Sequence, residues 1–128
     1  MVNKLDIIKD KLYNNIYRVD VFEKEYKKMF GKSKNLYLRE HEQLAINLCI
    51  LDTEMSAALE RDQFHAVIGH PPLYAIRHVS QANPRVLFIF TESDGAVVLL
   101  SCTLEKSKSD YNAAILRAED RLHLLEED

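Results

Sequence analysis

The sequence is short of cysteine, glycine, proline and long apolar runs. Its 128 residues include two cysteines, three glycines, three prolines and no tryptophan. Two cysteines are too few for the disulfide framework of a small secreted domain. The low glycine and proline content excludes a linker or a low-complexity chain. Strictly apolar runs such as Val86–Phe90 are far too short to cross a bilayer.

A secretory signal is also missing. The opening residues, "MVNKLDIIKDKLYNN", place acidic residues between the apolar ones and contain no small-residue cleavage site. We therefore predict a cytoplasmic protein. Cys49 and Cys102 have neither metal-binding nor redox spacing, so both are predicted to be reduced and buried.

Positive charge is not in excess. The chain has 17 lysines and arginines against 20 aspartates and glutamates, a formal net charge of −3. The overall field therefore does not attract nucleic acid, and an RNA contact would need a local basic patch. A hydrophobic fraction of 47% over this length fits one domain with its own core, spanning residues 1–128.

The first half of the chain predicts one strand followed by helices. Asn14–Phe22 alternates polar and apolar residues, which is typical of a strand. A short helix should follow and end at Gly31. A longer helical pattern begins after Asn35, its predicted N-cap, and forms either one helix or two with a break near Asp52. The prolines of Gly69–Pro72 end this region.

The second half predicts three strands and a helix. Leu73–Val79, Arg85–Phe90 and Ala96–Leu104 are joined by the short turns "SQANP" and "ESDG", which favours an antiparallel meander. The last helix should have Ser109 as its N-cap and Asp110 in its first turn. This order of elements predicts an α+β domain with helices packed on an antiparallel sheet.

Common catalytic and metal-binding motifs are missing. The sequence contains no glycine-rich phosphate loop, no nucleophile elbow and no second histidine after "HEQLA". His65, His70 and His78 lack ligand spacing, so we interpret them as structural or surface residues and predict no metal site.

A basic set that strand geometry could gather remains. Neighbouring antiparallel strands lie about 4.8 Å apart, so residues at their ends can surround one phosphate-sized site. Arginine suits phosphate recognition, and a tyrosine beside cations can transfer a proton. The alternatives are solvated strand ends for the arginines, a solvated linker for the lysines and core packing for the tyrosine. The set consists of Arg77, Arg85, Lys106, Lys108, Asp110 and Tyr111.

The arrangement from Leu73 onward resembles the RelE/HigB superfamily of toxins from type II toxin–antitoxin systems, and is most similar to its phage-derived, HigB-like branch. The matching features are a strand ending in arginine, an "RVLF" strand, an acidic-glycine turn, a "VVLL" strand, a basic linker and "DY" opening the final helix. The resemblance implies a RelE-like α+β fold. In it an antiparallel-rich sheet carries the N-terminal helices on one face, together with a C-terminal helix. Residues 1–14 would be an N-terminal extension.

The resemblance also implies an activity. Such toxins are small endoribonucleases that cut mRNA, usually on the ribosome, through attack of the RNA 2′-hydroxyl and without metal or cofactor. Arg85 would be the main clamp on the phosphorane, with Arg77 and Lys106 as supporting cations. Tyr111 and Asp110 would act in acid–base and orienting roles. Lys108 would bind substrate, and a cognate antitoxin, of helix-turn-helix type, would neutralise the toxin.

Two alternatives stay open. One is a non-catalytic, protein-binding member of the same fold, either similar to the gyrase-poisoning ParE branch or an inactive toxin. The other is an unrelated α+β domain. Glu105 beside Lys106, where family linkers are often more basic, and the acidic sequence pI of about 5.9 favour a weakened or silent member.

Overall fold

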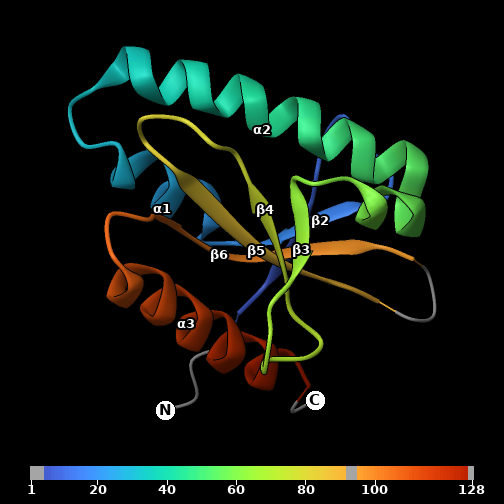
Figure 1. Cartoon of the computed structure of the whole chain (residues 1–128). Coiled ribbons are helices and arrows are strands. Elements are labelled where there is room, and N and C mark those ends of the chain that lie inside the picture. The colour runs from blue at the N-terminus through green and yellow to red at the C-terminus, as the bar shows by residue number, and fades with distance from the viewer. Residues whose placement is uncertain (1–4, 92–94, 127–128) are drawn as a thin grey trace.

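A six-stranded sheet organises the chain in the computed structural model, which describes residues 5–91 and 95–126. The strand order is β1-β2-β6-β5-β4-β3; β2 and β6 are parallel, and the other neighbours are antiparallel. Figure 1 shows α2 on one side of the sheet and α3 on the other. The strands are β1 (Ile7–Lys9), β2 (Ile16–Val19), β3 (Phe64–Ala66), β4 (Tyr74–Arg77), β5 (Pro84–Phe90) and β6 (Val97–Leu104). The helices are α1 (Phe22–Met29), α2 (Lys34–Glu54), the 3-10 helix η1 (Met55–Glu60) and α3 (Lys108–Glu126).

The predicted meander is confirmed. Strands β4, β5 and β6 pair antiparallel in sequence order. The β4–β5 turn is held by Ser80 and Asn83, since the backbone N–H of each donates to the side-chain oxygen of the other at 3.3 Å. Asn83 has a φ of +48°, a left-handed conformation that asparagine tolerates better than most residues. Residues 92–94 of the predicted "ESDG" turn lie outside the described residues.

The first predicted strand and the helices after it are present with shifted ends. The strand is only Ile16–Val19, because Phe22 already begins α1. Gly31 follows α1 with a φ of +60°, the left-handed conformation that ends helices, as predicted. Asn35 is not the N-cap of the long helix: α2 begins at Lys34, after Ser33. The break comes at Met55, which has a φ of +54°, and η1 continues from there.

Two strands were not expected. β1 pairs antiparallel with β2, so Ile7–Lys9 of the expected extension 1–14 forms one edge of the sheet. β3 pairs antiparallel with β4 and forms the other edge. Each is three residues long, and so short a segment carries no readable alternation of polar and apolar residues.

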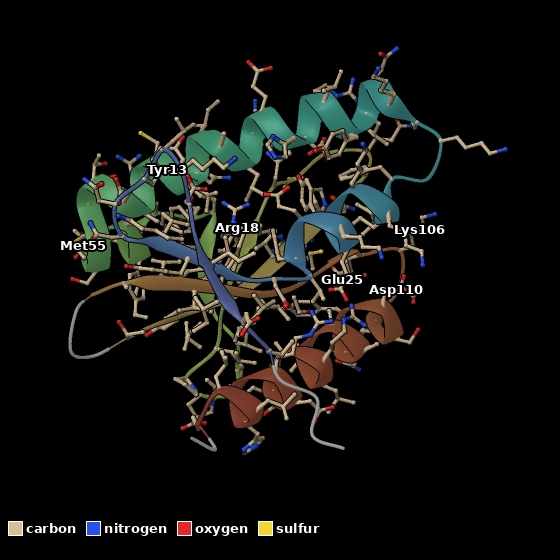
Figure 2. The ribbon with its side chains drawn as sticks, turned by 180° about the vertical axis from the view of Figure 1, so that it is seen from behind. Tyr13, Arg18, Glu25, Met55, Lys106 and Asp110 are labelled. Carbon is tan, nitrogen blue, oxygen red and sulfur yellow. The ribbon has the colours of Figure 1, made fainter. Side chains whose placement is uncertain are left out.

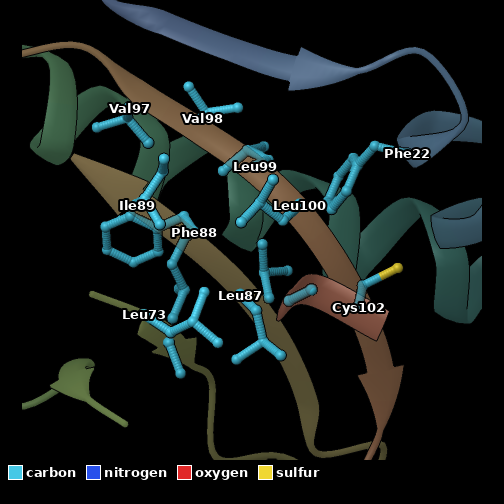
Figure 3. Close-up of a cluster of buried hydrophobic side chains, with 14 of the residues drawn as sticks. Phe22, Leu73, Leu87, Phe88, Ile89, Val97, Val98, Leu99, Leu100 and Cys102 are labelled. Carbon is cyan, nitrogen blue, oxygen red and sulfur yellow. The ribbon is translucent and has the colours of Figure 1, made fainter. Parts of the chain in front are cut away.

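The core fills both sides of the central strands (Figure 3). On one face, Tyr26 of α1 and Leu44 of α2 line a buried space with Val86 of β5. On the other face, the Ser101 hydroxyl donates a hydrogen bond of 2.8 Å to the Ala114 carbonyl of α3. The sheet is therefore covered by N-terminal helices on one side and by the C-terminal helix on the other, which explains why its central strands are apolar on both faces.

Two local predictions are wrong: the N-cap of the last helix and the burial of Cys49. Ser109 is not the N-cap of the last helix, because α3 begins one residue earlier, at Lys108. Cys102 is buried as predicted, but Cys49 is exposed on α2; both are free thiols. In the described part of the chain, none of the helices combines the length and apolar character needed to cross a membrane.

Candidate active site

The β4–β5 hairpin brings the two predicted arginines face to face. Arg77 and Arg85 are directly paired across the strands, so their side chains project from the same face of the sheet. This is the face that α3 covers, because Leu87, two residues beyond Arg85, pairs with Ser101 beneath the helix. The turn held by Ser80 and Asn83 fixes this register.

A pocket of about 200 Å³ opens where this face meets the start of α3. The strands supply its floor, the residue after β6 supplies one wall, and the first turns of α3 supply another. Its lining residues are His65, Ala75, Arg77, Arg85, Glu105 and Tyr111. Three of the predicted site residues, Arg77, Arg85 and Tyr111, therefore lie in one pocket.

The two arginines differ in their surroundings. Arg77 is exposed. Arg85 is only 5% exposed, and its Nη2 lies 2.8 Å from the Glu105 carboxylate while its Nη1 donates to the Pro84 carbonyl at 3.1 Å. A buried charge needs such a partner, because an unpaired guanidinium in the protein interior is strongly unfavourable. Arg85 is thus held in place by Glu105, and Arg77 faces solvent.

Tyr111 is set up to keep its proton. Burial raises the pKa of its phenol, and the Glu105 carboxylate raises it further, while Arg85 and Arg77 lower it in part. The phenol therefore stays protonated at neutral pH, as a proton donor must. The cationic neighbours would also stabilise the phenolate that remains after donation.

The other predicted residues lie outside the pocket. Figure 2 shows Lys106 and Asp110 together at the start of α3. One oxygen of Asp110 accepts the backbone N–H groups of Lys106 and Ser107, at 3.0 and 3.1 Å. This is the contact of an acidic residue in the first turn that reaches back to the helix start. Asp110 fixes the start of α3, while the side chains of Lys106 and Lys108 are exposed and line no part of the pocket.

Sequence reasoning missed two residues of the pocket. His65 was interpreted as structural or surface, yet it lies on β3 opposite Ala75 and therefore on the same face as Arg77. Its strand is too short to be read from the pattern. Glu105 was noted only as a departure from a basic linker, and its position directly after β6 was the available signal. Within residues 5–91 and 95–126, histidine, cysteine and acidic side chains form no cluster of three suited to a metal ion.

Comparison with known proteins gives a match in structure and none in sequence. No model of a protein family matches this chain, and no curated protein sequence matches it significantly. Among solved structures, this chain is similar to a double arginine-to-alanine mutant of the Escherichia coli toxin RelE in its free state. The TM-score is 0.51 with 15% sequence identity, over 83% of this chain and 98% of that one. The chain has a RelE-like fold.

The match covers nearly the whole of that RelE chain. This confirms the expectation of a RelE-like α+β fold with a mostly antiparallel sheet and a C-terminal helix. At 15% identity the similarity extends to the fold alone, and the role of the pocket follows from its own chemistry.

Proposed function

We propose that this protein is the toxin of a toxin–antitoxin pair and a metal-independent endoribonuclease that cuts mRNA on the ribosome. The observation that carries the proposal is the pocket shared by His65, Arg77, Arg85 and Tyr111 on a RelE-like fold. Two guanidinium groups, an imidazole and a protonated phenol around one small cavity suit a reacting phosphodiester.

The chemistry assigns one role to each group. The imidazole of His65 takes the proton of the 2′-hydroxyl, and the 2′-oxygen attacks the adjacent phosphorus. Arg77 and Arg85 stabilise the negative charge of the phosphorane. The Tyr111 phenol gives its proton to the departing 5′-oxygen, and the products are a 2′,3′-cyclic phosphate and a free 5′-hydroxyl. Asp110 is a positioning residue that anchors the helix turn carrying Tyr111.

The proposal also includes partners and a location. An acidic protein has little attraction for free RNA, so delivery of the mRNA by the ribosome supplies the local concentration that the toxin lacks. The protein acts in the cytoplasm, where a cognate antitoxin, of helix-turn-helix type, binds it. We place the chain in the HigB-like, phage-derived branch on the motifs of its second half. Lys106 and Lys108, exposed at the start of α3, would contact the RNA backbone away from the pocket.

One observation favours the alternative of a non-catalytic, protein-binding member. Glu105 neutralises Arg85 in the free protein, and a carboxylate in the pocket opposes an incoming phosphate. Induced expression in growing cells separates the two functions. The nuclease should arrest growth and leave cut mRNA. Tyr111→Phe should lose both effects. The control variant Tyr17→Phe, which changes a tyrosine on β2, should keep them. Full toxicity of Tyr111→Phe without mRNA cuts would establish the protein-binding function instead.

A further inference from the structure

A second cleft adjoins the candidate active site at the corner of the sheet, between α2 and the ends of β3 and β4. Its volume is about 600 Å³, within the range of about 300–1,000 Å³ of small-ligand sites. His65 and Arg77 line both this cleft and the pocket of the candidate active site, so the two spaces share a wall. A ligand held by Arg77 can therefore extend from one into the other.

The lining of the cleft combines amide, apolar and ionisable side chains, and the ionisable ones include Asp62 and His78 beside His65 and Arg77. Gln43 and Asn47 come from α2 and Gln63 from the residue before β3, while Ile46 and Val79 add apolar surface. An amide presents a donor and an acceptor in one plane, which is the pattern that reads the edge of a base. Exposed single-stranded bases are recognised through these edges and through contacts to their flat faces.

Among the cleft residues, Gln63 is best placed to hydrogen-bond the edge of a base. Asn47 is only 6% exposed, and its Oδ1 accepts the Gln63 Nε2 at 3.4 Å. This long hydrogen bond holds the half-buried Gln63 amide in a defined orientation and uses one of its two N–H groups. Within the described residues, the side-chain carbonyl oxygen and second N–H of Gln63 have no hydrogen-bond partner, so a ligand can use both. Asn47 thus positions Gln63, and Gln63 is the residue that contacts the ligand.

We propose that this cleft binds the base next to the scissile phosphate, and that Gln63 and Gln43 determine which RNA sequence is preferred. The inference rests on the proposed function, because it places the phosphate at Arg77. A base joined to that phosphate through its ribose reaches the neighbouring cleft across the shared wall. A protein segment is the less suitable occupant, since amide and ionisable side chains outnumber the three apolar ones, Ile46, Ile50 and Val79, in the lining.

The test measures base preference rather than rate. The full-length protein is titrated with deoxydinucleotides, which lack the attacking 2′-hydroxyl, and with inorganic phosphate. One bidentate amide–base contact is worth about 1–3 kcal/mol, so the tightest and weakest dinucleotides should differ in Kd by about five- to 150-fold. Gln63→Leu should reduce this spread to about threefold or less, and Gln43→Leu, on the opposite wall, should reduce it too. Gln81→Leu, exposed in the β4–β5 loop, should leave the spread unchanged.

Other outcomes separate the possible failures. If the wild-type protein binds phosphate and dinucleotides but Gln63→Leu and Gln43→Leu keep the full spread, this inference is wrong and the proposed function stands. If it binds neither ligand, this inference is wrong, and cleavage of mRNA on translating ribosomes decides the proposed function. If both variants weaken capture of the antitoxin and leave dinucleotide binding unchanged, the cleft is a protein interface and the inference is overturned.

Discussion

Replacing Glu105 by glutamine is the most informative single change in the candidate site. In the wild-type protein the Glu105 carboxylate lies 2.8 Å from Arg85 Nη2, with its side chain 26% exposed and that of Arg85 only 6%. Glu105→Gln keeps the size and an acceptor oxygen for Arg85 but removes the negative charge. The site pocket gains one net positive charge while its shape is preserved.

Two opposite effects should follow. The ion pair weakens, and because water partly screens Glu105, the free energy of unfolding should fall by about 1–2 kcal/mol, less than for a fully buried pair. Removing a charge that repels phosphate should strengthen anion binding by about 1–2 kcal/mol, or roughly five- to thirtyfold in Kd. The pKa of Tyr111 should also fall, because Glu105 is one of the groups that raise it.

The assays are urea unfolding, calorimetric titration with inorganic phosphate and ultraviolet titration of the tyrosines. Glu42→Gln, an exposed carboxylate change on α2, is the control and should alter none of the three measurements. Unchanged phosphate affinity together with an unchanged tyrosine titration would show that Glu105 does not oppose an anion at Arg85. The electrostatic reasoning for the pocket would then be refuted.

Three further outcomes are expected. Arg85→Ala should lower the free energy of unfolding by about 1–3 kcal/mol in urea titrations, since it deprives Glu105 of its partner; unaltered stability would contradict the burial of Arg85. Tyr111→Phe should unfold within about 1 kcal/mol of the wild type yet cut RNA about 10²–10⁴-fold more slowly, and an equal cleavage rate would remove Tyr111 from the chemistry. Burial raises the pKa of the Cys102 thiol from 9.0 to about 12 in the folded protein. The thiol of the unfolded chain therefore ionises at lower pH than that of the folded protein, and the free energy of unfolding falls as the pH rises through 9. Between pH 9 and 10 the wild type should lose about 1 kcal/mol more than Cys102→Ala, and parallel pH profiles would refute this.

Much of the fold could be predicted because its signals are local. The meander follows from three runs of apolar residues separated by short polar turns, and Gly31 marks a helix end through its own backbone freedom. Helix starts were less predictable. Asn35 and Ser109 are both good capping residues, but α2 begins at Lys34 and α3 at Lys108, so several nearby polar residues satisfy the same local rule. The edge strands β1 and β3 depend on pairing with distant residues, which no local pattern reveals.

In the candidate site, too, some residues could be placed from local sequence patterns and others could not. Arg77, Arg85 and Tyr111 could be placed together from strand alternation and helix order alone. His65 could not, because its place in the pocket depends on the pairing of β3 with β4. Lys106 and Asp110 are adjacent in sequence to Glu105 and Tyr111, but the chain turns into α3 there. That turn directs the Asp110 carboxylate to backbone amides instead of the pocket.

Cleavage of mRNA by purified components tests the proposed nuclease most directly. The protein is added to translating ribosomes programmed with a defined mRNA, and the cut ends are mapped and their termini analysed. We predict cuts with 2′,3′-cyclic phosphate and 5′-hydroxyl ends. Arg77→Ala should slow them by about 10²–10³-fold, as loss of a transition-state donor does. Arg77 is exposed and its loss spares the fold, while Arg39→Ala, an exposed arginine change on α2, should cut at the wild-type rate. Intact mRNA with the wild-type protein, or equal cutting by Arg77→Ala, would contradict the account.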